Sequence, residues 1–357
     1  MKAQRFILFA IAAALPVFGS VTYSCDATIA ADGPSGLCNY LNTTFAGIYG
    51  SAFSNANASI LIQYANNGGL ADSTTGFYNL VKYSTYQSAL QSESTDSAKA
   101  FVPVLEPGTF STDDVEVTSA LANALGITTV DGGGSVAGTT AGGGACFTPG
   151  NGAALNVNNA SSCYNGIIQV NIPADLQAQH NQGYTYRSLG GSTTGTTTNY
   201  DFFTVVEHET DEVLGTSSCI GTGGAGGTLT NPVNCAAAVD LFRYTSSGTR
   251  TFNTIGANAY FSPDGGVTDP FSNNYNNQAN SQDWADFSSN CKFVQDRQGC
   301  LSSTGVDITN DNGSGGAGPE VAILNAVGYN TAPEPATFGL LGVSLVALAI
   351  VRQRRRS

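Results

Sequence analysis

The apolar positions of the chain recur at two different spacings, which predict a mixture of helices and strands. From residue 38 to residue 53, apolar side chains return every three or four positions, as on an amphipathic helix. Residues 59–64 form a short apolar run that ends in Asn-Asn-Gly-Gly, as expected of a buried strand. The same reasoning predicts a strand from residue 77 leading into a helix near 86–90, a helix over 115–125, a strand over 167–172, a strand and turn over 260–266, and a helix over 319–329.

Residues 202–215 carry the most informative pattern. Apolar residues lead into His208, and Gly215 closes the segment, so we expect a helix. Residues four apart lie on the same helix face, which makes His208 and Glu212 project together while Glu209 is rotated away. The structural alternative is an ordinary acidic amphipathic helix whose valines and leucine lie in the core.

The functional interpretation of this helix is a catalytic zinc site. Such a site needs about three protein ligands and one open position for water. His208 and Glu212 would supply two ligands, and Glu209 follows the histidine directly, as the general base does in His-Glu-x-x-His helices. In that role Glu209 would take a proton from water and pass it to a leaving amine.

A third ligand has to come from elsewhere in the chain. Asp240 is the first candidate because it is a lone acid that follows the loop bounded by Cys219 and Cys235. His180 is the second candidate, although its polar neighbours favour an exposed side chain. Arg243 and Tyr244 follow Asp240, and each either polarises a substrate carbonyl or serves the structure only.

Composition and charge exclude one class of partner. Charged residues make up 11% of the chain, against roughly 25% in typical soluble domains, while the 41% hydrophobic content supports a packed core. The net charge is −13, yet six of the 13 basic residues lie at the two ends of the chain. The remainder has 7 basic residues against 26 acidic ones. The part of the chain between the two basic ends is therefore strongly acidic. It repels nucleic acid and anionic membrane surfaces, so nucleic-acid binding is excluded.

The eight cysteines fall into four neighbouring pairs. They are Cys25 and Cys38, Cys146 and Cys163, Cys219 and Cys235, and Cys291 and Cys300. No C-x-x-C spacing occurs, which argues against a thiolate zinc site or a redox motif. The simplest hypothesis is four short-range disulfides stapling the loops, each contributing roughly 3 kcal/mol if it closes about 15 residues. One pair lies in a Gly-rich insertion, residues 131–165, which we expect on the surface.

The first 19 residues have the pattern of a secretory signal peptide. Lys2 and Arg5 precede an apolar run over residues 6–18, and small residues near Ser20 suit cleavage. A membrane anchor is the less favoured alternative, because the run is only about 13 residues long.

The other end of the chain has three parts in order. Pro333-Glu334-Pro335 precedes an apolar run over residues 336–351, and an arginine cluster follows. Residues 331–357 resemble the PEP-CTERM sorting signal of Gram-negative exported proteins. The resemblance implies a short transmembrane helix that holds the protein transiently in the inner membrane, recognition by an exosortase, and delivery to the cell surface or extracellular matrix. A plain C-terminal anchor is the alternative.

The intervening domain, residues 20–330, resembles a family of PEP-CTERM-bearing bacterial proteins described as metalloprotease-like. The likeness is carried by residues 200–215, 240–244, 260–266 and 324–329. It implies an α+β domain of the zincin or metzincin type, with the motif helix packed under a small mixed sheet. The implied function is an exported zinc-dependent peptidase that hydrolyses polypeptide substrates with a metal-activated water.

The chain also departs from the metzincin pattern. Glu212 stands where metzincins have their second histidine, and Ser218 stands where the third would be. Met1 is the sole methionine, so a metzincin Met-turn is impossible. A catalytically inactive zincin-fold protein serving in the matrix or in adhesion is therefore the alternative function. A calcium-stabilised module around Asp307 and residues 310–312 is weaker, because the spacing matches no EF-hand.

Overall fold

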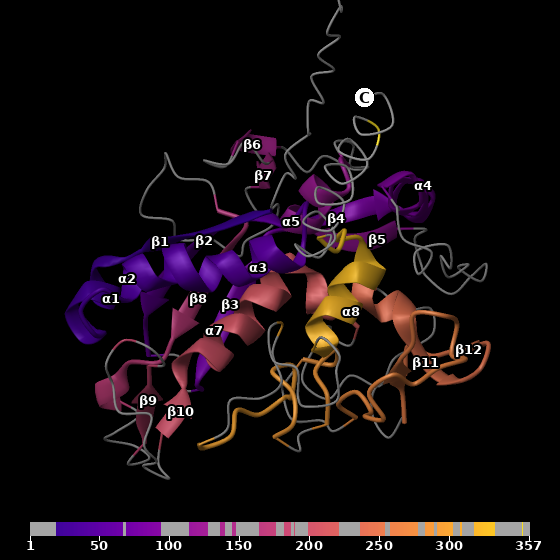
Figure 1. Ribbon diagram of the computed structural model, residues 1–357. Coiled ribbons are helices and arrows are strands. Elements are labelled where there is room, and N and C mark those ends of the chain that lie inside the picture. The colour runs from indigo at the N-terminus through magenta and orange to yellow at the C-terminus, as the bar shows by residue number, and fades with distance from the viewer. Residues whose placement is uncertain are drawn as a thin grey trace, which may run out of the picture.

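The computed structural model describes most of the predicted domain (Figure 1). The described residues are 19–66, 69–93, 114–127, 136–139, 145–147, 164–175, 182–186, 189, 199–220, 236–253, 258–277, 283–288, 291–302, 308, 318–332 and 352.

The N-terminal half of the chain contains a four-stranded mixed sheet with strand order β1-β2-β8-β3. Strands β1 (Ser20–Cys25), β2 (Asn57–Tyr64) and β8 (Gly166–Val170) run parallel, and β3 (Ala71–Thr75) pairs antiparallel with β8 at the edge. The predicted strands over 59–64 and 167–172 are thus confirmed. In β2, Ile60 and Ile62 are fully buried, which fits a sheet covered by helices.

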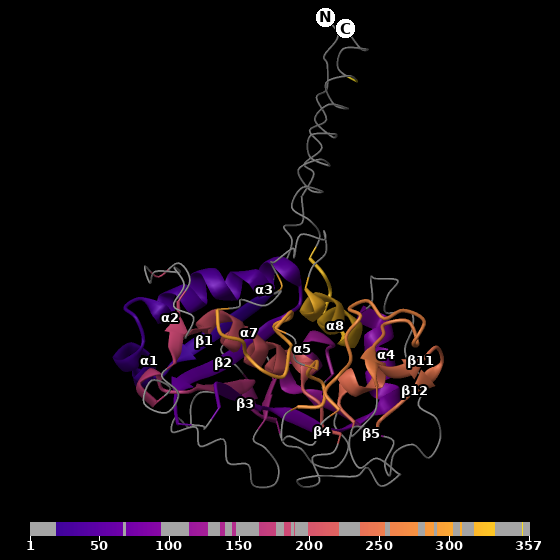
Figure 2. The same cartoon turned by 90° about the horizontal axis from the view of Figure 1, so that it is seen from below.

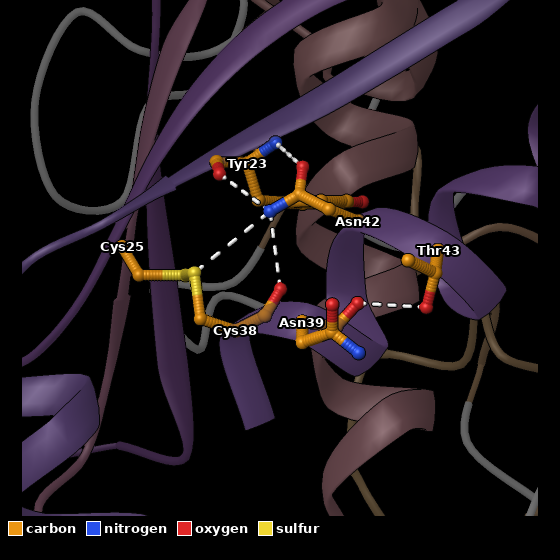
Figure 3. The surroundings of a disulfide bond; sticks show 6 residues. All are labelled: Tyr23, Cys25, Cys38, Asn39, Asn42 and Thr43. Atoms are coloured by element: carbon orange, nitrogen blue, oxygen red, sulfur yellow. Dashed lines mark hydrogen bonds between the residues drawn. A yellow bond between two sulfur atoms is a disulfide. The ribbon is translucent and has the colours of Figure 1, made fainter. Parts of the chain in front are cut away.

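The helix predicted over residues 38–53 is also confirmed. It consists of α2 (Leu37–Tyr40), a π-helical turn η1 (Leu41–Phe45) and α3 (Ala46–Ala52), and α3 packs against β1. A short helix α1 (Ala27–Asp32) precedes it. Asn42, in the π turn, accepts a hydrogen bond from the Tyr23 amide and donates one to the Tyr23 carbonyl (Figure 3). The Asn42 side chain therefore pairs the backbone N–H and C=O of Tyr23 at the open edge of β1. Unpaired backbone groups at a sheet edge can otherwise pair with another chain.

The motif helix α7 (Phe202–Asp211) packs against β3 and β8 and continues into a π-helical turn, η3 (Glu212–Thr216). Seen from below, α3 and α8 (Pro319–Val327) lie on one side of the molecule and β3, β4 and β5 on the other, with α7 between them (Figure 2). The predictions of helices over 202–215 and 319–329 are confirmed.

One predicted helix is wrong in its first half. Residues 114–118 form β5 (Asp114–Thr118), which pairs antiparallel with β4 (Phe77–Lys82), and only α5 (Ser119–Ala124) is helical. Val115 and Val117 are fully buried at alternate positions, so the strand period applies here. Thr118 caps α5 by accepting a hydrogen bond from the Leu121 amide. The strand after residue 77 does lead into a helix, α4 (Tyr83–Glu93).

The remaining elements are short. They are β6 (Val136–Thr139) with β7 (Ala145–Phe147), β9 (Gly183–Thr185) with β10 (Asn199–Asp201), the 3₁₀ helix η4 (Ala238–Phe242), and β11 (Arg243–Ser246) between β12 (Thr249–Arg250) and β13 (Tyr260–Phe261). The small sheets and the helices together confirm the α+β class.

Two of the predicted disulfides are present. Cys25 bonds Cys38, and Cys291 bonds Cys300 (Figure 3 shows the first). Cys219 is also disulfide-bonded, and none of the cysteines in the described part is free. One loop near each end of the domain's sequence is therefore closed by a short covalent link, as the spacing predicts.

Several predictions fall on residues outside the described ranges. These are the signal peptide, most of the Gly-rich insertion, His180, the acidic loop around residues 307–312, and the apolar run over 336–351. Within the described ranges, no helix is long and apolar enough to span a membrane.

Candidate metal centre

Helix α7 is fixed at both ends by its own sequence. Asp201 caps the start by accepting a hydrogen bond from the Thr204 amide at 2.8 Å. Phe202 and Val206 are fully buried and anchor one face in the core. At the other end, Gly215 has a φ of 141°, and a Cβ there would lie 3.4 Å from the Leu121 side chain. The polar face of the helix is thereby held at a fixed angle over the sheet.

Three metal-ligating side chains converge on this polar face. His208 Nε2 lies 3.6 Å from Glu212 Oε1 and 3.5 Å from Asp286 Oδ1. One ligand atom from each of the three residues lies within 4.8 Å of the other two. His208 and Glu212 are thus brought together as predicted. Asp286 comes from the loop over residues 283–288, which sequence reasoning did not single out.

The imidazole of His208 is oriented by a backbone carbonyl. Its Nδ1 lies 2.9 Å from the carbonyl oxygen of Val294, which can only accept a hydrogen bond. Nδ1 therefore carries a proton and donates it, so in the neutral ring the lone pair of Nε2 faces the two carboxylates. A carbonyl partner on the second ring nitrogen is the usual support for a metal-binding histidine.

Glu209 lies at the same site but not among the three converging groups. Its side chain is 7% exposed and lines the same cavity as His208 and Glu212. Burial raises the pKa of Glu209 well above its ordinary range, and the charge of Glu212 raises it further. Ser73, on the edge strand β3, donates a hydrogen bond to Glu212 Oε2.

The three converging groups shift one another's pKa values. Burial and the charge of Glu212 raise the pKa of Asp286 to about 7, although His208 opposes the shift. Burial lowers the pKa of His208, but the charges of Asp286, Glu212 and Glu209 raise it well above its ordinary value. Glu212, in contrast, has a lowered pKa because its contacts with His208 outweigh its burial.

The donor set fits a divalent metal. One imidazole nitrogen with a free lone pair and two carboxylates form a nitrogen and oxygen set of the kind that zinc accepts. The Asp286 carboxylate is buried and that of Glu212 is partly buried, and buried charges are normally paired or bound to a metal.

The converging groups open into a cavity of about 730 Å³. It lies between the edge strand β3, helix α7, and the segment closed by the Cys291–Cys300 disulfide. Its acidic lining residues are Asp72, Glu209, Glu212, Asp283, Asp286 and Asp296.

Asp240 is not brought to this group. Its carboxylate is fully buried and accepts hydrogen bonds from Ser218 Oγ at 2.6 Å and from the amides of Cys219 and Ala237. It stabilises the first turn of η4, and it does not line the cavity. These contacts tie Asp240 to η4, and the acid that lies beside His208 and Glu212 is Asp286.

Ser218 links these two regions. Besides bonding Asp240, its amide donates to both carboxylate oxygens of Asp283, at 3.1 and 3.0 Å. Ser218 therefore holds the loop that carries Asp286.

Arg243 and Tyr244 are also structural. Arg243 is 1% exposed, donates to the carbonyls of Trp284 and Asn253, and lies 4.6 Å from the centre of the Tyr275 ring. Tyr244 is 2% exposed, and Arg250 lies over its ring. Neither side chain lines the cavity.

Comparison with known proteins identifies one segment of the chain. Residues 331–356 match the PEP-CTERM protein-sorting motif. No curated protein and no solved structure matches the chain. The motif confirms the prediction made from the Pro-Glu-Pro sequence and marks an exported, surface-sorted protein of Gram-negative bacteria that the exosortase machinery recognises.

Proposed function

We propose that this exported protein is a zinc-dependent peptidase of zincin type. His208, Glu212 and Asp286 would hold the metal, and Glu209 would be the general base. The proposal is supported above all by the convergence of these four side chains on one cavity.

The chemistry is hydrolysis of a peptide bond. Zinc, when bound, supplies a Lewis acid that polarises a carbonyl and acidifies water. Glu209 accepts a proton as the water oxygen attacks the carbonyl carbon, and returns it to the amine when the carbon–nitrogen bond breaks. Burial raises the pKa of Glu209, which makes its carboxylate a stronger base. Val294 keeps the His208 proton on Nδ1 throughout.

Glu209→Gln tests the catalytic role. The amide is isosteric but cannot accept the proton, so we expect peptidase activity to fall by about 10²- to 10⁴-fold while zinc content is unchanged. Cleavage of a peptide library, followed by mass spectrometry, and elemental analysis of the purified protein measure the two quantities.

Glu116→Gln is the matched control. Glu116 is a partly buried carboxyl group whose pKa is raised to about 7 by desolvation and by the charge of Asp240, but it does not line the cavity. It should retain full activity. A wild-type protein that binds zinc and cleaves no peptide would support the non-catalytic surface role. A protein without zinc would remove the metal centre itself.

The stability of the metal-free protein should fall as pH rises. Asp286 has a folded pKa of about 7 and an ordinary value of 3.8, so its folded form favours the proton. The stability this provides is complete below the unfolded pKa and is lost as pH rises through the folded one. We therefore expect the Tm of chelator-treated protein to drop by several degrees between pH 5 and pH 8.

Zinc should reverse this trend, because it binds the deprotonated carboxylates. Thermal unfolding with chelator and with zinc, at both pH values, measures the difference. Asp286→Asn removes the titrating group and should reduce the pH dependence of the metal-free protein. A zinc-induced increase in Tm that is as large at pH 5 as at pH 8 would contradict the prediction.

A further inference from the structure

Two consecutive residues, Val294 and Gln295, form hydrogen bonds to one proposed ligand and to the chain neighbours of the other two. The Val294 carbonyl accepts the hydrogen bond from His208. The Gln295 carbonyl accepts one at 2.8 Å from the amide of Phe287, the residue after Asp286. These two carbonyls therefore tie a ligand on α7 and a ligand on the 283–288 loop to one short segment.

The side chain of Gln295 completes the connection. Its Nε2 donates a hydrogen bond at 3.1 Å to Oδ2 of Asp211, the residue before Glu212. Gln295 is 1% exposed and Asp211 is fully buried. A hydrogen bond from an amide to a carboxylate away from water is stronger than one between neutral groups. It fixes the distance between the motif helix and the segment that orients His208.

The segment is itself held in place by local contacts. Asp296 Oδ2 accepts hydrogen bonds from the amides of Lys292 and Phe293, and the Cys291–Cys300 disulfide closes the loop around them. A rigid segment transmits the position set by Gln295 to the neighbouring Val294 carbonyl.

We propose that Gln295 is a positioning residue for the metal centre, acting through its hydrogen bond to Asp211. The proposal rests on the proposed metal site. Metal ligands from separate elements must meet at distances near 2 Å, so a shift of one element relative to the other weakens binding. Supporting groups of this kind typically change metal affinity by about 10- to 100-fold.

Reversing the polarity of the pair tests the proposal. Gln295→Glu places two carboxylates against each other without changing side-chain size, and zinc affinity at pH 8 should fall by about 10- to 100-fold. Adding Asp211→Asn restores a donor and an acceptor with the roles exchanged, because the new asparagine donates to the new glutamate. The double variant should recover most of the affinity. Asp211→Asn alone keeps an acceptor for Gln295 and should have a small effect.

The readout is zinc affinity by competition with a chelating dye, together with the visible spectrum of the cobalt-substituted protein, which reports ligand geometry. Asn325→Leu is the control for general destabilisation, because Asn325 is buried and donates one hydrogen bond to the Tyr329 carbonyl. It should lower Tm without changing zinc affinity. If Gln295→Glu folds and binds zinc as the wild type does, or if the double variant gives no recovery, the positioning role is wrong. If the wild type binds no zinc, the failure belongs to the proposed function.

Discussion

Asp286→Ala is expected to abolish stoichiometric zinc binding, whereas Asp240→Asn should leave it intact. Asp286 is one of only three converging donors among the described residues, and its loss leaves one imidazole and one carboxylate. Loss of a supporting group costs about 10- to 100-fold in affinity, so loss of a ligand should cost more than about 100-fold. Asp240 already accepts three hydrogen bonds from the protein and has no contact with the site.

Elemental analysis after dialysis against a weak chelator measures zinc per chain for both variants. Circular dichroism establishes that each is folded. Asp240→Asn retains one acceptor oxygen, so we expect this variant to fold and its zinc content to be comparable with that of the wild type. Zinc content at the wild-type level in Asp286→Ala would exclude Asp286 as a ligand. Loss of zinc from folded Asp240→Asn would return Asp240 to the ligand set.

The sequence predicts the motif helix and the approach of His208 to Glu212 well because the relevant information is local. The spacing of His208 and Glu212 fixes their common face on any helix, and the apolar residues around them fix which face is buried. The strands of the mixed sheet are predicted for the same reason. The prediction is wrong for β5 because this strand runs directly into a helix, α5. The apolar period changes from that of a strand to that of a helix at Thr118.

The place of Asp286 was not predictable in this way. Asp286 lies in a loop with no regular period, and the loop is held by hydrogen bonds of its neighbours Asp283 and Phe287 to Ser218 and Gln295, which lie far apart in the sequence. The available signal is an acid between two apolar residues, Ala285 and Phe287, that are both buried. Asp240 has a similar signal, being buried between Val239 and Leu241. Only the fold distinguishes a buried acid that serves as a cap from one that faces a cavity.

Asp240→Ala should destabilise the protein by about 3–5 kcal/mol, the range for breaking a buried charge network. The substitution removes the acceptor for Ser218 Oγ and for the amides of Cys219 and Ala237. It also removes a negative charge that raises the pKa of Arg243, whose guanidinium is already destabilised by burial. The charged Arg243 side chain would remain buried without the favourable electrostatic interaction with Asp240.

Urea unfolding of the zinc-loaded protein under conditions that keep the disulfides intact measures this loss of free energy. Asp240→Asn should cost less, because its remaining carbonyl oxygen can accept one of the three hydrogen bonds. Asp264→Ala is a matched surface control: Asp264 also accepts hydrogen bonds from its own loop, at Ser262 and Thr268, but it is far less buried. An unfolding free energy for Asp240→Ala within about 1 kcal/mol of the wild type would show that the network around η4 contributes little. Asp240 would then be free to serve another role.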